Sequence, residues 1–432
     1  MSVSERIASP ASDVFDVKRR RLVIAATIGN LLEWYDFFAY GILAITIARL
    51  FFPAQSEVTS LLLALATYGG GLAMRPLGAI VLGLYADRVG RKAALCLSMY
   101  LMGLGTAVIA FTPTYETIGI SAPLLILMAR LLQGFSGAGE LGSATALLVE
   151  NAPPHRRGVY ASLNAASQQV GFVLSAFVVM LVTLAMTPSQ IEAGGWRLPF
   201  VFGLAIVPVA IYIRSGVEEP DLFAGQRRQH RTTDRTSTIR NGQSLLLAVG
   251  ILALYVVAGN ILFVYMPTFA VQKLGLASSA ALLSTVVATF VMIVCTPIAG
   301  ALSDRIGRKP LLLVAGVVYV LVTYPAYDVI MAWPSAAVLM IVHSLLGLLN
   351  AIYVGPLLSA LAELFPARFR ATSVALAFSL TVMVGALSPA FATWLTAYTG
   401  DPRSPAFIVI GAGVLSVLAV RRYKDRHKEA LS

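Results

Sequence analysis

The chain has 432 residues, of which 58% are hydrophobic and only 12% are charged, and its mean hydropathy is +0.80. This composition excludes a soluble globular domain and indicates a protein that crosses a membrane many times. The formal net charge of +11 does not indicate nucleic-acid binding, because the cationic residues lie in short segments between apolar runs.

Twelve apolar runs are each long enough to cross a bilayer as a helix. We therefore expect an all-α integral membrane protein with twelve transmembrane helices. The runs begin near residues 22, 60, 93, 122, 159, 196, 244, 280, 311, 335, 371 and 405.

The Lys and Arg residues predict which side of the membrane each loop faces. All but six of the 32 fall before the first apolar run, in every second loop or in the C-terminal tail. Positively charged loops remain in the cytoplasm. Both termini are therefore expected to be cytoplasmic.

The longest polar segment, 214–243, is rich in Arg, Ser, Thr and Gln, as is typical of a flexible linker. It divides the chain into two predicted six-helix bundles. The expected parts are a cytoplasmic tail at 1–21, a bundle at 22–213, the linker at 214–243, a second bundle at 244–422 and a tail at 423–432.

A short loop occurs twice, as GLYADRVGRK at 83–92 and GALSDRIGRK at 300–309. The matching residues are 217 positions apart, about half of the chain, which indicates an internal duplication and two pseudo-symmetric halves. Glycine permits a tight turn, and acidic and basic side chains can pair where helices leave the lipid. We expect gating roles for Asp87, Arg91, Asp304 and Arg308.

A second repeat supports the duplication, because Glu150 and Arg157 have the same spacing along the chain as Glu363 and Arg370. All four are expected at cytoplasmic helix ends. Salt bridges of a gate are more plausible there than contacts with a substrate.

The first predicted helix contains two acidic residues, Glu33 and Asp36, which share one helix face with Tyr40. The matching segment of the seventh helix has Asn260 where the first has Asn30, but Phe263 where the first has Glu33. Ionised groups within a membrane indicate function by default. We predict that the acids carry a coupling proton, with structural pairing to a buried Arg as the alternative.

Two cations, Arg75 and Arg130, lie inside predicted membrane helices, and Gln133 and Glu140 follow Arg130 in the sequence. Arginine suits the bidentate capture of a carboxylate. We predict that Arg130 and Arg75 bind a substrate anion, the alternative being fixed ion pairs with buried acids. Glu140 is either a third proton site or the counter-ion of Arg130.

Further polar residues in the apolar runs are candidates for lining a substrate cavity. Gln168 belongs to a polar stripe on the fifth helix that could equally serve helix packing. His343 could relay protons or be a satisfied packing residue. The predicted cavity residues are Tyr40, Gln133, Gln168, Asn260, His343 and Asn350.

The repeated loop resembles the signature loops of the major facilitator superfamily. Within it, GNLLEWYDFFAYG at 29–41 resembles the first helix of the metabolite:proton symporter family. RPLG at 75–78, RLLQG at 130–134, Gly-Glu at 139–140, WRLPF at 196–200 and ELFP at 363–366 fit the same family. QGFS at 133–136, SQQV at 167–170 and YTGD at 398–401 look most like the citrate and tricarballylate carriers.

This resemblance implies a bacterial inner-membrane symporter that imports a small organic acid, such as citrate, together with a proton. Dicarboxylate, shikimate-like and betaine or proline substrates remain alternatives, as do an exporter or exchanger and a sensor without transport. Its expected partners are the organic anion, the proton and the lipid bilayer, with the chain acting as a monomer. The buried polar residues form no nucleophile, metal or cofactor constellation, so we expect neither an enzyme nor a cofactor.

Overall fold

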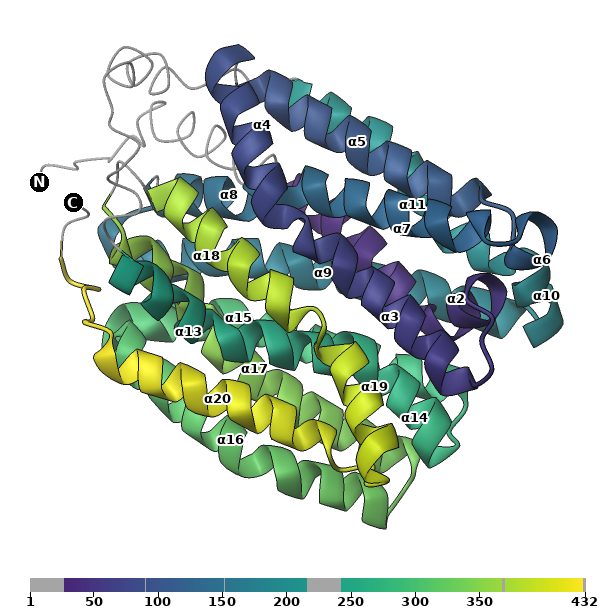
Figure 1. Ribbon diagram of the computed structural model, residues 1–432. Coiled ribbons are helices and arrows are strands. Elements are labelled where there is room, and N and C mark those ends of the chain that lie inside the picture. Colours follow the sequence, from purple (N-terminus) through teal and green to yellow (C-terminus); the bar gives the residue numbers. More distant parts are fainter. Residues whose placement is uncertain (1–26, 90, 151, 216–241, 367–369, 430–432) are drawn as a thin grey trace, which may run out of the picture.

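The computed structural model describes residues 27–89, 91–150, 152–215, 242–366 and 370–429. The regular structure within these ranges is entirely helical. Figure 1 shows the helices of the first half, in purple to teal, beside those of the second half, in green to yellow.

The first half begins with a helix at Thr27–Ile42, which bends by 66° into α2 at Ala44–Phe51. It continues with α3 (Glu57–Ala73), α4 (Arg75–Val89), α5 (Arg91–Phe111), α6 (Tyr115–Ile118), α7 (Ser121–Ser136), η1 (Gly137–Gly139), α8 (Glu140–Glu150), η2 (Pro154–Arg156), α9 (Arg157–Ala185), α10 (Pro188–Ala193), η3 (Gly195–Arg197) and α11 (Leu198–Ser215).

The second half comprises α13 (Gly242–Asn260), a π-helical turn η7 (Ile261–Tyr265), α14 (Met266–Leu274), α15 (Ser278–Ile306), α16 (Arg308–Ala332), α17 (Ala336–Leu364), α18 (Arg370–Gly385), α19 (Ser388–Thr399) and α20 (Pro405–Arg422). Within the described residues, each of the twelve predicted runs coincides with one of these helices or with a consecutive group of them.

Eight helices of the described residues are long and apolar enough to cross a membrane, or nine if the bent pair counts as one span. The apolar helices at Leu97–Phe111 and Ser121–Ser136 are shorter. The second of these continues through η1 into α8, so the 3₁₀ turn of small residues at Gly137–Gly139 lies within a predicted membrane crossing.

Local sequence explains several helix boundaries. Ser56 and Ser335 cap α3 and α17, since each side chain accepts a backbone N–H three residues later. Gly307 separates α15 from α16 with a φ of +99°, a conformation that favours glycine. The π-helical turn η7 is followed by Pro267, whose missing N–H cannot bond to the preceding turn.

The two halves contact each other along most of their length. At one end, which we call the gate end, Gly158 of α9 packs directly on Gly300 of α15. Near the middle, Phe38 and Phe172 of the first half meet Phe263 of the second, with Phe172 and Phe263 ring centroids 4.2 Å apart.

The Tyr68 hydroxyl donates to Asn260 Oδ1 at 3.0 Å across the same interface, one helical turn before Phe263. The described residues thus join the halves at the gate end and near the middle.

Candidate functional site

Three buried ionisable side chains come from consecutive parts of the first half. Glu33 and Asp36 lie on the helix Thr27–Ile42 and are 4% and 3% exposed, and Arg75 at the start of α4 is fully buried. Burial of charge is costly unless hydrogen bonds or an opposite charge compensate for it. The contacts of each group therefore indicate what it can do.

Glu33 and Arg75 form an ion pair, in which Arg75 Nη1 donates to Glu33 Oε1. Arg75 Nη2 donates to the Gly137 carbonyl at 2.8 Å. The guanidinium also lies 5.4 Å from the ring centroids of Trp34 and, across the interface between the halves, Phe378. Arg75 was considered either as a ligand for a substrate anion or as the partner of a buried acid. This geometry corresponds to the partner of a buried acid.

Asp36 belongs to a different network, built with two helices of the first half. The Thr106 hydroxyl of α5 donates to Asp36 Oδ2, and Gln133 Nε2 of α7 donates to Thr106 Oγ1 at 2.9 Å. Asp36 Oδ1 has no hydrogen-bond partner in the part of the chain that the structure describes. Gln133 therefore contacts Asp36 indirectly, through Thr106.

Glycines leave room for both carboxylates. A Cβ atom on Gly137 would collide with the Glu33 carboxylate, and one on Gly203 of α11 would come within 2.5 Å of Asp36 Oδ1. Any larger residue at either position would have to displace the acid. Gly137 thus serves the Glu33–Arg75 pair twice, through its carbonyl and through its missing side chain.

Arg130 is fully buried on α7 but is not held by a carboxylate among the described side chains. Its Nη2 donates to the backbone carbonyl of Asp36 at 3.3 Å, and its guanidinium lies 4.1 Å from the Tyr40 ring centroid and 5.3 Å from that of Phe37. Nε and Nη1 have no hydrogen-bond partner within the described residues. Arg130 therefore retains donors that an anionic ligand could use.

The surroundings of Arg130 extend to the second half of the chain. Tyr40 donates to the Ala64 carbonyl at 3.2 Å and stacks on Tyr68, whose hydroxyl donates to Asn260. Asn260 Nδ2 donates to the Val256 carbonyl at 2.8 Å. Arg130, Tyr40, Tyr68 and Asn260, which we call the Arg130 cluster, thus join the two halves.

The other predicted cavity residues lie in separate places. The Tyr255 hydroxyl of α13 donates to Gln168 Oε1 at 2.5 Å, which makes Gln168 a second polar link between the halves. His343 is fully buried and its Nδ1 lies 3.2 Å from the Ser284 hydroxyl of α15. Asn350 is 2% exposed, and its Nδ2 has no partner among the described residues.

The gate end contains a network around the second repeated loop. Arg308 contacts Asp304 at 2.8 Å and Glu363 at 3.1 Å. Asp304 also accepts the backbone N–H groups of Gly158 at 2.8 Å and Val159 at 3.2 Å. These N–H groups belong to the first turn of α9, which attracts negative charge. An acid of the second half therefore caps a helix of the first.

A second ion pair crosses between the halves at the same end. Arg370 Nη1 of α18 contacts Glu150 Oε1 of α8 at 2.9 Å, and Arg370 Nε donates to the Ala362 carbonyl at 2.8 Å. Among the described side chains, Glu363 thus pairs with Arg308 and Glu150 pairs with Arg370.

The C-terminal tail joins the gate end. Asp425 Oδ2 accepts the backbone N–H of Lys309 at 2.9 Å, and Arg157 Nη1 donates to the Glu429 carbonyl at 2.9 Å. Partial burial raises the pKa of Asp425, but hydrogen bonds from the backbone N–H groups of Lys309 and His427 outweigh it, so that the pKa lies below its ordinary value. The tail therefore contacts both halves.

Three predicted site residues have side chains outside the described set, namely Asp87, Arg91 and Glu140. Their contacts are consequently left as predictions. No group of three His, Cys, Asp or Glu side chains in the described ranges could hold a metal ion.

Sequence reasoning missed several residues that complete these networks. Thr106 follows Gly105 on the third predicted helix, and Tyr68 precedes three consecutive glycines on the second. A polar residue next to small ones in an apolar run was the available signal. Trp34 and Phe378 gave no such signal, since aromatic residues are common in membrane helices.

Comparison with known proteins identifies the family. A model of the Major Facilitator Superfamily matches residues 26–324 and 277–431. The citrate-proton symporter of Klebsiella pneumoniae is 38% identical over 399 residues, which cover 92% of this chain and 90% of that protein.

Other relatives carry different names. The alpha-ketoglutarate permease of Escherichia coli K12 is 33% identical over 374 residues, 84% of each chain. The proline/betaine transporter of the same strain is 30% identical over 416 residues, which cover 93% of this chain and 83% of that one.

Among solved structures, the proton:xylose symporter XylE bound to 6-bromo-6-deoxy-D-glucose superimposes with a TM-score of 0.77 at 18% identity, covering 95% of this chain and 97% of that one. This likeness shows the fold. The family model and the relatives together show that the chain belongs to the Major Facilitator Superfamily and is a multi-pass membrane transporter, not an enzyme.

Proposed function

We propose that this protein is a proton-coupled symporter that imports a small organic acid, citrate or a related tricarboxylate. The observation that carries the proposal is the contrast between its two buried cations. Arg75 is paired with Glu33, whereas Arg130 lies beside the interface between the halves and has no carboxylate partner among the described side chains. An unneutralised Arg in a membrane favours an anionic ligand.

In this proposal Arg130 binds a substrate carboxylate, and Tyr40 and Asn260 of the Arg130 cluster offer further polar contacts. Gln133, Gln168, His343 and Asn350 remain candidates for lining the open cavity. Arg75, predicted above as a second anion ligand, is assigned instead to the Glu33 ion pair.

The coupling proton is assigned to Glu33 or Asp36, with Glu140 as a further candidate. Protonation of Glu33 would cancel its attraction for Arg75. Protonation of Asp36 would remove a negative charge from the residue whose backbone carbonyl Arg130 contacts. Either event would make the site more positive before a polyanion enters. Proton and substrate binding would thereby favour each other.

Alternating access would arise from the two proposed bundles, 22–213 and 244–422, moving against each other around the Arg130 cluster. The ion pairs of the gate end would break when the cavity opens on that side. We place this end in the cytoplasm of a bacterial cell, because the positive loops and tail predict it. A monomer suffices for this mechanism.

The names of the relatives support citrate as the first substrate to test. The experiment is uptake of labelled citrate into cells that express the protein, at acid and at neutral external pH, with and without a protonophore. Faster uptake at acid pH that collapses with the protonophore is expected. A protein that reaches the membrane but gives no uptake above a vector control would refute citrate as the substrate.

The named relatives also motivate two rival substrates, 2-oxoglutarate and betaine or proline. An excess of unlabelled competitor separates them from citrate, and shikimate tests a cyclic acid in the same way. Release of preloaded citrate only when external substrate is present would indicate an exchanger. Loss of preloaded citrate that is faster than from vector-control cells, without external substrate, would indicate an exporter.

A further inference from the structure

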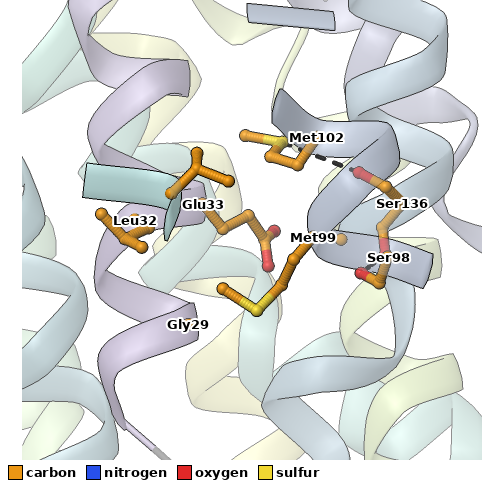
Figure 2. A pocket seen from close by; sticks show the side chains of 9 residues that line it. Gly29, Leu32, Glu33, Ser98, Met99, Met102 and Ser136 are labelled. Atoms are coloured by element: carbon orange, nitrogen blue, oxygen red, sulfur yellow. Dashed lines mark hydrogen bonds between the residues drawn. The ribbon is translucent and has the colours of Figure 1, made fainter. Parts of the chain in front are cut away.

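A small pocket reaches the Glu33 carboxylate from inside the first half of the chain. It is lined by Glu33 with Gly29 and Leu32 of the first helix, by Ser98, Met99 and Met102 of α5, by Ser136 and Gly137, and by Val207 of α11. Figure 2 shows the Glu33 carboxylate pointing into the space toward Met99, with Ser98 and Ser136 on the far side. The pocket has room for about one water molecule.

Polar groups continue from this pocket toward the second acid. The Ser98 hydroxyl donates to the Ser136 carbonyl at 2.6 Å, and the Ser136 hydroxyl donates to the Gln133 carbonyl at 2.8 Å. The Gln133 side chain then contacts Thr106, which donates to Asp36. One line of polar groups along α5 and α7 therefore joins the surroundings of both carboxylates.

The pocket is formed within the first half, because every residue that lines it belongs to that half. On the interface side, Arg75 lies between Glu33 and the rings of Trp34 and Phe378. Glu33 is thus placed between two environments, a pocket within one bundle and a cation that faces the other bundle.

We propose that the pocket is the proton route to Glu33, and that it is distinct from the route of the substrate. This inference rests on the proposed symport. A hydronium ion in the pocket gives its proton to the Glu33 carboxylate, which forms an O–H bond and leaves neutral water. Arg75 then loses its anionic partner. This changes the contacts of its guanidinium with Trp34 and Phe378, where the halves meet. Deprotonation reverses each change.

The test fills the pocket without touching Glu33 or the Arg130 cluster. Val207→Phe places a ring in the pocket, and Val207→Leu adds a single methylene. The control is Val201→Phe, the same substitution on the same helix at a side chain that is exposed rather than facing the pocket. Each protein is reconstituted in vesicles and assayed for citrate uptake driven by a pH gradient and for citrate exchange at equal pH.

Gradient-driven uptake needs the proton to bind and leave in every cycle, whereas exchange can proceed with the proton retained. We expect Val207→Phe to slow uptake by about tenfold, equivalent to about 1.4 kcal/mol in the barrier. Exchange should stay close to that of the wild type, which also shows that the variant is folded. Val207→Leu should show a smaller loss of uptake, and Val201→Phe none.

The inference is overturned if the rate of gradient-driven citrate uptake is the same for Val207→Phe and Val201→Phe. It is also overturned if uptake and exchange fall by the same factor in both Val207 variants, because the pocket then serves folding or substrate passage. Failure of the wild-type protein to respond to the pH gradient is a different result and refutes the proposed symport itself.

Discussion

The two buried arginines differ in what neutralises them, and this difference separates their roles. Arg75 has the Glu33 carboxylate, a backbone carbonyl and two aromatic rings around it. Arg130 has a backbone carbonyl and the rings of Phe37 and Tyr40. An aromatic face attracts a cation but leaves its N–H donors available, so Arg130 can still bind a carboxylate.

We predict that Arg130→Lys weakens citrate recognition, because an ammonium group retains the charge but cannot form two parallel hydrogen bonds. The KM for citrate uptake should rise by about 10- to 100-fold, or about 1.4–2.7 kcal/mol. Arg197→Lys is the control, since Arg197 also lies over an aromatic ring, at 4.5 Å from Trp196, but outside the Arg130 cluster. Equal KM values for the two variants would contradict the assignment of Arg130.

We predict that Gly137→Ala impairs proton coupling, because the new methyl group must displace the Glu33 carboxylate from Arg75. Gradient-driven uptake should fall by about tenfold or more. Gly70→Ala is a matched control, since a Cβ atom there meets nothing within 4 Å. Uptake by Gly137→Ala equal to that of Gly70→Ala would show that the Glu33–Arg75 geometry is dispensable.

At the scale of elements, the turn between α15 and α16 organises the gate end. Gly307 ends one helix and begins the next, so that Asp304 and Arg308 lie on opposite sides of a sharp change in direction. Asp304 faces the first turn of α9, and Arg308 faces Glu363 on α17. One turn thus places two charges toward two different helices.

We predict that Gly307→Ala destabilises this turn, because a side chain at a φ of +99° is strained and its Cβ would lie 2.6 Å from Asp425 Oδ2. The loss should be about 1–3 kcal/mol, visible as a lower melting temperature of the purified protein. Gly411→Ala on α20 has open space and helical geometry, so it should be neutral. A melting temperature of Gly307→Ala equal to that of the wild type would argue against the strain.

At the scale of the whole molecule, the gate end is where charges join the halves. Glu150 and Asp304 each bridge from one half to the other, and the C-terminal tail contacts Lys309 and Arg157 on opposite sides. These contacts hold the described conformation closed at this end. Transport that opens this end must break them in every cycle.

We predict that Glu150→Arg and Arg370→Glu each lower citrate uptake, because like charges then face each other across the halves. The double exchange should recover part of the activity, since it restores an ion pair with reversed polarity. The Glu150 side chain is 42% exposed, so its coupling should be small, on the order of 1 kcal/mol. Strictly additive losses in the double variant would rule out a direct pairing.

We predict that docking of the C-terminal tail weakens in acid. The folded-state pKa of Asp425 is below its ordinary value, so the ionised group stabilises the fold above that value. The stabilisation is lost as the pH falls through the folded-state pKa, below about pH 4. The melting temperature of the wild type should exceed that of Asp425→Asn at neutral pH and approach it in acid. A pH-independent difference would exclude this linkage.

The sequence by itself determined the all-helical membrane fold and the duplication, because these follow from hydrophobic run lengths and from a loop that occurs twice. The resemblance of its motifs to known ones indicated the family. The sequence also identified Glu33, Asp36, Arg75 and Arg130 as important, since a charge in an apolar run is costly wherever it lies. These inferences need only local sequence.

Only the tertiary structure decided which buried charges meet. Spacing along the chain allowed either arginine to pair with an acid of the first helix, and helix packing placed Arg75 on Glu33 and Thr106 on Asp36. The same holds at the gate end, where helix packing placed Arg308 on Glu363 and Arg370 on Glu150. The physical reason is that ion pairs depend on angstrom-scale distances set by helix rotation and packing, which the order of residues in a helix does not specify.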